Sequence, residues 1–577
     1  MAETDVFPAD FNRRCSEYLE SLYGKKLCTT LTMRLRGKLV AFKKMHEQPT
    51  FAPWSERDAI IVTYGDSICR DKHPLQTLNY FLSEPLQGLV STVHILPYFP
   101  ASTDNEYAIS DYRAVASEYG SWYDIERIGE QFNLMTDLII NHVSRENSWF
   151  LDFVNGFKPG CDFFIEIEEE HPLCGDAEHR PLVTEVQTKR GRRHLWSSFS
   201  HNQFDLNYKN PQLLFEMVDI LLFYLGKGSR FIRLEAVEYI WKEQGTSCVN
   251  QPQTHTIVKL LRLLMQSAAP GSRLVTQTDL PTVQTCSYFG AGDESQLVYQ
   301  QPIPALLLYT LHSGDSSDLT RYLASHQPPP DSCSYLNCLT SPEGFLLQPL
   351  NDLLPNSAID NLLHEMRQRG GIITMRANAA TEMRPYSLNI PLVDAFAAGG
   401  DHSEAKRLAA AIAAHTILLT LRGIPTFYIE GFTVASRNGS PLADKRSHAH
   451  GRFCCNFDTL IAQLQQQKSL NAQLFSEVKR LLTIRQKYAV FHPEAAQQSV
   501  AAGDKLFALW RFALDGQSSL LALGNPGEAT LTATLPANLS GKSGHELLSD
   551  TTLTLPATLP IDPYTTLWLW FDHKIEA

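Results

Sequence analysis

The chain has 577 residues, which is too long for one compact core and indicates a large domain with smaller domains attached. Its formal net charge of -12 and its lack of basic runs argue against a general affinity for nucleic acids or anionic membranes. No run is long and apolar enough to span a bilayer, and the first residues lack the basic and apolar regions of a secretory signal. We therefore expect a cytoplasmic protein that binds neither nucleic acid nor membranes.

The eleven cysteines are scattered along the chain, without Cys-x-x-Cys pairs and without the His-rich spacing of metal ligands. This pattern predicts reduced, mostly buried thiols and gives no support for a structural metal site. Cys454 and Cys455 are adjacent, and neighbouring residues form a disulfide only with strain. We expect no bridge between these two residues.

Residues 1–50 are predicted to form a helical arm, because apolar side chains recur there at helical spacing among Leu, Arg, Lys and Glu. Beyond the arm, short apolar runs alternate with helix-like segments, a pattern typical of parallel βαβ units. Eight such runs predict strands, the number that closes a (β/α)8 TIM barrel. They are 59–64, 90–97, 134–141, 231–235, 273–277, 296–300, 334–339 and 424–429.

The other segments divide the chain around this barrel, which we assign to residues 51–143 and 205–492. Residues 144–204 form a long polar and aromatic insertion after the third strand, and its length and aromatic content favour a small folded lid, or B domain. A second insertion, residues 340–400, is expected to be irregular and to wall the other side of the same mouth. In residues 493–577 short strands alternate with turns, which predicts a C-terminal antiparallel β-domain.

The fourth predicted strand carries the clearest sign of a functional site. Residues 231–241 read Phe-Ile-Arg-Leu-Glu-Ala-Val-Glu-Tyr-Ile-Trp and follow a helix-like segment and a Gly-Lys-Gly turn. Arg233 and Glu235 are two residues apart, so their side chains project to the same face of a strand. Active sites of such barrels lie at the carboxyl ends of the strands. Polar residues follow other predicted strands in the same way: Asp66, Asn141, His142, Gln277 and Glu343.

This strand resembles the fourth barrel strand of the α-amylase superfamily, and the chain is most similar to its sucrose phosphorylase and glucosylglycerate phosphorylase families. The resemblance implies a retaining transfer of glucose from a non-reducing glucoside to inorganic phosphate, the co-substrate, through a covalent glucosyl-enzyme. It implies no metal or organic cofactor. The matching stretches include Thr63-Tyr-Gly-Asp, His94-Ile-Leu-Pro-Tyr, Asp137-Leu-Ile-Ile-Asn-His, Arg193-His-Leu-Trp, Phe204-Asp-Leu-Asn-Tyr, Tyr288-Phe-Gly-Ala-Gly-Asp and Gly423-Ile-Pro.

The resemblance also assigns five residues to a glucose pocket. Asp104 would bind the far hydroxyls and Tyr107 would supply the aromatic platform under the ring. His142 closes the third-strand motif, Arg233 precedes the nucleophile position, and Arg452 would sit at the rim. Each also has a simpler interpretation, such as a turn residue for Asp104 or a surface charge for Arg452. Their order along the barrel favours the sugar pocket.

The positions that carry the chemistry differ from the family. Glu235 stands where the family has an aspartate nucleophile, and its extra methylene moves the carboxylate by about 1 Å, which can cost on the order of 10²-fold in rate. Gln277 stands at the acid/base position, where the family has glutamate, and loss of a general acid costs about 10²- to 10⁴-fold. At the transition-state stabiliser position the family's His-Asp is Pro342 and Glu343.

Three hypotheses follow from these substitutions. We favour a pseudoenzyme that keeps a glucoside-binding pocket, with a small-molecule glucoside as its partner. The alternative is an active retaining glucosyltransferase, phosphorylase or hydrolase with Glu235 as nucleophile and Asp279 or water as acid, since Asp279 would share the face of Gln277 if the strand continues. The third hypothesis is a scaffold protein, in which the barrel is retained only for its surface. The sequence leaves open whether the protein forms a homodimer or binds a protein partner. Glu106 and Glu238 replace family glycines beside the site.

Overall fold

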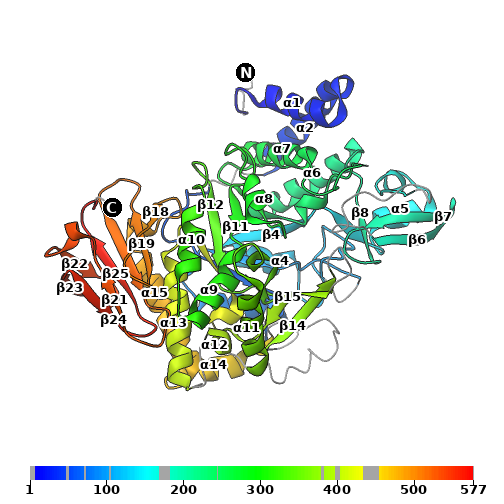
Figure 1. Ribbon diagram of the computed structural model, residues 1–577. Helices are drawn as coiled ribbons and strands as arrows, with labels where there is room; N and C mark the ends of the chain where they lie inside the picture. The colour runs from blue at the N-terminus through cyan, green and yellow to red at the C-terminus, as the bar shows by residue number, and fades with distance from the viewer. Residues whose placement is uncertain are drawn as a thin grey trace.

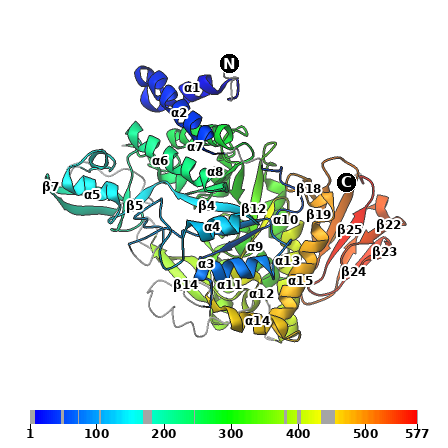
Figure 2. The ribbon, with the colours of Figure 1, turned by 180° about the vertical axis from the view of Figure 1, so that it is seen from behind.

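A barrel lies at the centre of the molecule, with helices of the N-terminal arm above it, an inserted lid on one side and a C-terminal sheet on the other (Figure 1). The view from behind shows the lid and the sheet again on opposite sides (Figure 2). The computed structural model describes residues 7–46, 51–70, 73–102, 106–167, 182–243, 245–377, 383–396, 403–432 and 454–575.

Eight parallel strands close the barrel in the order β1-β16-β12-β11-β10-β9-β4-β3. This confirms the predicted (β/α)8 TIM barrel, and each strand falls on one of the eight predicted apolar runs. Their bounds are β1 (Ile60–Thr63), β3 (Thr92–Ile95), β4 (Asn133–Ile139), β9 (Ser229–Glu235), β10 (Arg273–Thr276), β11 (Leu297–Tyr299), β12 (Ser334–Cys338) and β16 (Ile424–Tyr428).

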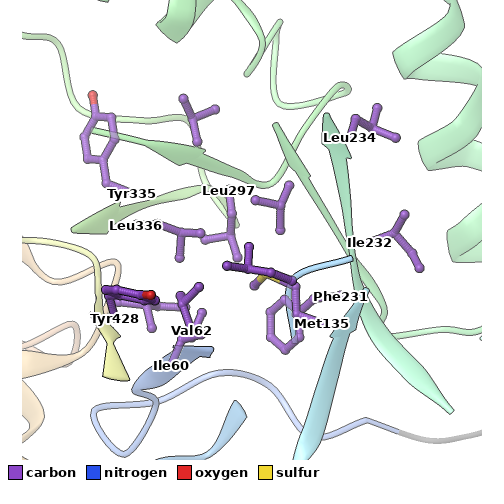
Figure 3. Packing of buried hydrophobic residues seen from close by; sticks show 14 of the residues in the cluster. Ile60, Val62, Met135, Phe231, Ile232, Leu234, Leu297, Tyr335, Leu336 and Tyr428 are labelled. Carbon is purple, nitrogen blue, oxygen red and sulfur yellow. The ribbon is translucent and has the colours of Figure 1, made fainter. Parts of the chain in front are cut away.

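Side chains alternate along β9 between the barrel interior and the surrounding helices. Phe231 points into the barrel, where it meets apolar side chains of other strands, whereas Ile232 and Leu234 point outward (Figure 3). Because successive residues of a strand face opposite sides, Arg233 and Glu235 share the inward side of Phe231. The apolar core therefore ends where these two polar side chains begin.

Helices surround the barrel, and several begin with a proline, whose missing N–H costs nothing at the first position of a helix. They are α3 (Pro74–Ser83), α6 (Pro211–Gly226), α7 (Pro252–Ala268) and α9 (Pro302–Ser313). In the part of the chain that the structure describes, no helix has both the length and the apolar character needed to cross a membrane.

The N-terminal arm consists of two helices, α1 (Phe11–Tyr23) and α2 (Lys25–Met45). Gly24 separates them with a φ of 82°, a backbone conformation that favours glycine. The arm packs on α6 and α7, so its apolar stripe faces the outer helices of the barrel.

Both ends of the lid are held at the barrel mouth by one short antiparallel pair, β5 (His142–Ser144) with β8 (Gln203–Asp205). Between them lie α5 (Ser148–Asn155) and a hairpin of β6 (Leu182–Thr188) and β7 (Gly191–Ser197). The hairpin extends away from the barrel (Figure 1). The lid thus begins and ends directly beside the carboxyl end of β4.

The described residues of the segment 340–400 are more regular than the irregular insertion expected from the sequence. They contain a three-stranded antiparallel sheet in the order β13 (Phe345–Leu346), β15 (Met383–Asn389), β14 (Ile372–Ala377). They also contain the helix α11 (Asn356–Gln368), whose buried residues follow the i, i+3, i+4, i+7 spacing of an amphipathic helix: Ile359, Leu362, Leu363 and Met366.

The C-terminal region forms a mainly antiparallel β-domain that packs against the barrel through α13 (Glu404–Thr420). Trp568 anchors it, because its indole N–H donates to Thr420 Oγ1 at 2.8 Å and its ring centroid lies 4.7 Å from that of Phe491. The six-stranded sheet comprises β18 (Ala496–Ser499), β19 (Phe507–Phe512), β20 (Ser519–Gly524), β25 (Thr566–Phe571), β22 (Ser543–Glu546) and β23 (Thr551–Thr554).

Candidate active site

The residues assigned to the nucleophile and acid/base positions lie at the carboxyl ends of two neighbouring barrel strands, Glu235 as the last residue of β9 and Gln277 directly after β10. The register pairs Leu234 of β9 with Thr276 of β10. The residues that follow, Glu235 and Gln277, therefore stand at the same level, on strands about 4.8 Å apart. The fold brings together two positions that are 42 residues apart in the printed sequence.

A buried ion network lies one layer deeper in the barrel. Asp137 of β4 is paired in register with Arg233 of β9; it accepts a hydrogen bond from Arg233 Nη1 at 2.5 Å and lies 3.1 Å from His94 Nε2. Burial alone would raise the pKa of Asp137, but Arg233 and then His94 outweigh it and hold that pKa below its ordinary value. Asp137 is therefore a carboxylate that orients the Arg233 guanidinium.

Within the part of the chain that the structure describes, Glu235 has no comparable partner, and its Oε2 is buried without a hydrogen bond. Burial, partly offset by Arg233 and reinforced by Glu238, raises the pKa of Glu235 to about 8. The carboxyl group is mainly protonated at pH 7. The next residue, Ala236, has a φ of 51°, a left-handed conformation that is uncommon for a residue with a side chain and concentrates at functional sites.

Glu238 and Asp279 place two more acids at the same mouth. Glu238 Oε1 accepts a hydrogen bond from the backbone N–H of Asp279 at 3.0 Å, while Glu238 Oε2 is buried and has no partner among the residues that the structure describes. Burial and then Asp279 raise the pKa of Glu238 to about 8. The strand does not continue as far as Asp279, because β10 ends at Thr276 and Glu238 accepts the hydrogen bond of the Asp279 backbone N–H. The condition under which Asp279 would share the face of Gln277 is therefore not met.

Glu343 reaches this mouth from the turn that follows β12. A Cβ added to Gly344, whose φ is 92°, would lie 2.2 Å from the Leu388 carbonyl oxygen, so this turn packs tightly against β15 and needs glycine. The Glu343 side chain is accessible to water, but protein atoms surround it on most sides and displace much of the water around its carboxyl group. This desolvation and then Asp279 raise the pKa of Glu343 to about 7, against the opposing effect of Arg233.

The hairpin of β14 and β15 supplies an aromatic and a basic side chain beside the acids. Tyr386 OH donates a hydrogen bond to Asp279 Oδ2 at 3.4 Å, and the Arg376 guanidinium lies 5.1 Å from the centre of the Tyr386 ring. Desolvation raises the pKa of Asp279, and Arg376 opposes this rise. Asp279 therefore has both a nearby hydroxyl donor and an elevated affinity for a proton.

Tyr107 shares the electrostatic environment of these groups. Burial raises the pKa of its hydroxyl well above 10, and the charges that act on it are Arg233, Asp137, Glu343 and Glu235. The phenol is consequently neutral, with its half-buried ring next to the ion network. An aromatic ring with one polar end is suited to contact the apolar face of a sugar.

His142 is held as a neutral ring by the residues at the base of the lid. Asn141 Nδ2 and Gln203 Nε2 each lie 3.3 Å from one of its ring nitrogens, and burial lowers the pKa of His142 to about 4. Asn141 is itself fixed by Lys242, whose Nζ donates to Asn141 Oδ1 at 2.7 Å and to Asp205 Oδ2 at 2.6 Å. The lid and the barrel meet in this buried network.

Asp104 and Arg452, the other two residues assigned to the sugar pocket, lie outside the described residues. Sequence reasoning assigned no role to His94, Asp137 or Lys242, although a charged side chain inside an apolar strand is the signal by which the first two could be found. Within the described ranges, no group of three or more His, Cys, Asp or Glu side chains is arranged to hold a metal ion.

The raised pKa of Glu238 predicts a pH-dependent stability. Between its ordinary pKa of 4.5 and about 8, the folded state keeps a proton that the unfolded state releases, so stability falls as pH rises. The slope from one such group is at most about 1.4 kcal/mol per pH unit.

We expect Glu238→Gln to keep the contact with Asp279 and to flatten the fall of Tm between pH 5 and pH 8 in thermal unfolding. Glu118→Gln, at an exposed position, is the matched control. If Tm fell equally steeply with pH in the unmodified chain, in Glu238→Gln and in Glu118→Gln, the raised pKa of Glu238 would be contradicted.

Comparison with known proteins gives matches over the whole chain. The catalytic domain of the alpha-amylase family matches residues 85–324. Glucosylglycerate phosphorylase of Escherichia coli (strain K12) is 33% identical over 564 residues, which cover 96% of this chain and 100% of that protein. Glucosylglycerate phosphorylase of Spirochaeta thermophila is 35% identical, covering 84% of this chain and 83% of that protein.

The solved structures support the same assignment at the level of the fold. The crystal structure of sucrose 6F-phosphate phosphorylase from Thermoanaerobacter thermosaccharolyticum matches with a TM-score of 0.70 and 21% identity, over 88% of this chain and 99% of that one. The full-length match at 33% identity goes further than the fold. This chain belongs to the glucosylglycerate phosphorylase family, within the α-amylase superfamily.

Proposed function

We propose that this protein binds a glucoside in the barrel mouth and that its transfer of glucose to phosphate is absent or strongly impaired, as in a pseudoenzyme. The observation that carries this proposal is the buried Glu235 carboxyl group, whose Oε2 has no hydrogen-bond partner among the described residues, at the same level as the amide Gln277. Burial raises the pKa of Glu235 to about 8, which disfavours the ionised form at pH 7. A retaining mechanism needs an ionised nucleophile and a proton donor about 5 Å apart, and this pair offers little of either.

The sugar-binding half of the site supports the other part of the proposal. Asp137 and Arg233 form a buried ion pair, Tyr107 lies beside it, and His142 is fixed as a neutral ring. Groups held in this way are already oriented before a ligand arrives, which reduces the entropy cost of binding. We therefore assign Tyr107, His142 and Arg233, together with Asp104 and Arg452, to glucoside binding.

Asp279 supports a second candidate, an active retaining phosphorylase or hydrolase with a relocated acid. Desolvation raises the pKa of Asp279, and Tyr386 holds its carboxyl group at the mouth. A carboxyl group whose pKa is raised holds its proton more readily, which favours a role as the acid that protonates a leaving oxygen. In this candidate Glu235 is the nucleophile and inorganic phosphate the co-substrate, and the rate increases with pH as Glu235 ionises toward its pKa of about 8.

A phosphorolysis assay separates the two candidates. Sucrose and glucosylglycerate are each incubated with phosphate between pH 6 and pH 9, and glucose 1-phosphate is measured. We expect no turnover at ordinary enzyme concentrations, because neither the nucleophile nor the acid is in its working state. A turnover of about 1 s⁻¹ or more, the lower end for typical enzymes, would exclude the pseudoenzyme. Loss of that turnover in Asp279→Asn would then establish the relocated acid.

A titration calorimetry experiment tests the binding half of the proposal. Glucose or glucosylglycerate is expected to bind with millimolar affinity, which corresponds to about 4 kcal/mol. Tyr107→Ala and Asp104→Ala should each weaken this binding, whereas Tyr123→Ala, at an exposed tyrosine of the helix α4 (Trp122–Gly129), should not. Binding that is unchanged by the first two substitutions would place any sugar site elsewhere.

A further inference from the structure

Three thiols gather where two short strands join distant parts of the chain at the barrel mouth. β2 (Ile68–Cys69), which follows β1, pairs in parallel with β17 (Cys455–Asn456), which precedes the helix α14 (Phe457–Gln465). Cys454 directly precedes β17, so Cys69, Cys454 and Cys455 lie in one small cluster.

One pair in this cluster is close enough to react. Cys69 Sγ lies 3.6 Å from Cys454 Sγ, and both side chains are half-buried. The Cys454 thiol donates to the Asp66 carbonyl oxygen at 3.3 Å, and the Cys69 thiol points to the Cys455 carbonyl oxygen at 3.7 Å. A disulfide has an S–S length of about 2.05 Å, so the two sulfur atoms need to approach by about 1.5 Å. Side-chain rotation or a small backbone shift has to supply this movement.

The third thiol is a poor competitor for either of these two. Cys454 and Cys455 are adjacent, and a bridge between neighbours is strained. Burial, followed by the effect of Cys454, raises the pKa of Cys455 to about 12, and the sulfur of Cys69 contacts the sulfur of Cys454 and the backbone carbonyl oxygen of Cys455. The geometry singles out Cys69 with Cys454.

We propose that Cys69 and Cys454 form a site of reversible oxidation, at which a hydroperoxide converts the two thiols into one disulfide. One of the two sulfur atoms attacks one peroxide oxygen, the O–O bond breaks, and the other oxygen leaves as water or alcohol, which gives a sulfenic acid. The second sulfur then attacks the oxidised sulfur, the S–O bond breaks, and water leaves. Two thiols and one hydrogen peroxide thus give one disulfide and two waters, and an added dithiol reverses the reaction.

The two thiols affect each other. The hydrogen bond with Cys454, and then burial, raise the pKa of Cys69 well above its ordinary value. The overall reaction is the same whichever of the two sulfur atoms attacks the peroxide first. Because the two sulfur atoms already lie together, the second step gains from a high effective concentration.

The disulfide would join two parts of the barrel mouth that are 385 residues apart along the chain. Cys69 lies three residues after Asp66, beyond the carboxyl end of β1, and Cys454 lies two residues after Arg452. Oxidation would therefore restrain the chain next to Arg452 relative to the loop after β1. Closing so long a loop also restricts the unfolded chain and raises the melting temperature.

Peroxide treatment of the full chain tests the proposal. After excess hydrogen peroxide is removed, the protein is alkylated under denaturing conditions, digested without reductant and analysed by mass spectrometry. We expect one major linked peptide pair, containing Cys69 and Cys454, and two fewer free thiols than in the untreated chain. Dithiothreitol should restore both thiols, and the oxidised protein should melt at a higher temperature than the reduced one.

Serine variants provide the controls. Cys69→Ser and Cys454→Ser should give no linked peptide, whereas Cys455→Ser, in the same cluster, should give the same peptide as the unmodified chain. Cys161→Ser, at a half-buried thiol of the lid, should also leave it unchanged. Circular dichroism confirms that each variant folds. A linked pair other than Cys69–Cys454, or oxidation to sulfinic acid without any linked peptide, would overturn the proposal.

Discussion

The combined variant Glu235→Asp, Gln277→Glu, Pro342→His and Glu343→Asp is expected to transfer glucose to phosphate at least about 10²-fold faster than the unmodified chain. The shorter side chain at position 235 withdraws the carboxyl group from the anomeric carbon. A glutamate at position 277 restores the proton donor on the neighbouring strand, at the level fixed by the register of β9 and β10. Rates of phosphorolysis of sucrose and glucosylglycerate measure the gain.

The four single variants are the controls for this experiment. Residues that act as one catalytic unit are strongly non-additive, so each single reversion should gain little. Glu106 and Glu238 are the expected obstacles in the combined variant, because each puts an acid where the family tolerates glycine. If the variant folds, binds sugar and stays inactive after both are also changed to glycine, the substituted catalytic residues are not the main cause. The pocket itself would then have been remodelled.

The barrel could be predicted from the sequence because each of its strands is a run of apolar residues between a helix-like segment and a polar residue. The pair β2 and β17 could not, since strands of two residues carry no periodic pattern. The helix α11 was detectable in principle, because Ile359, Leu362, Leu363 and Met366 have helical spacing within a segment that we expected to be irregular. The β14–β15 hairpin that follows it has several exposed positions and therefore a weaker pattern.

Some features of the candidate site could be predicted from the local sequence, whereas others depend on tertiary contacts. Arg233 and Glu235 could be placed on one inward face because the period of a strand is local. The position of Asp279 could not, because it depends on a hydrogen bond from its backbone to Glu238, which lies 41 residues away. The pKa of Glu235 depends on burial and on the absence of a direct cationic partner among the described residues, and neither property is visible in the sequence.

The largest effect on stability is expected from Asp137→Ala. This substitution removes the only carboxylate to which Arg233 donates within the described residues, and it also removes the partner of His94. Asp137, Arg233 and His94 are all more than 90% buried, so water cannot replace the lost partner in place. Removal of one member of a buried ion pair typically destabilises the fold by about 3–5 kcal/mol, because the other charge stays buried without compensation.

Thermal unfolding at pH 7, followed by calorimetry, measures this effect. Asp137→Ala should lower the Tm of the barrel by roughly 5 °C or more. Asp137→Asn keeps an oxygen that can accept a hydrogen bond from Arg233 but loses the charge. Its Tm should therefore lie between the Tm of the unmodified chain and that of Asp137→Ala. Asp279→Ala is the matched control, since it removes a carboxylate from the same mouth that water can reach and that forms no buried pair. If Asp137→Ala and Asp279→Ala lowered the Tm equally, the buried Asp137–Arg233 ion pair would stabilise the fold no more than an accessible carboxylate does.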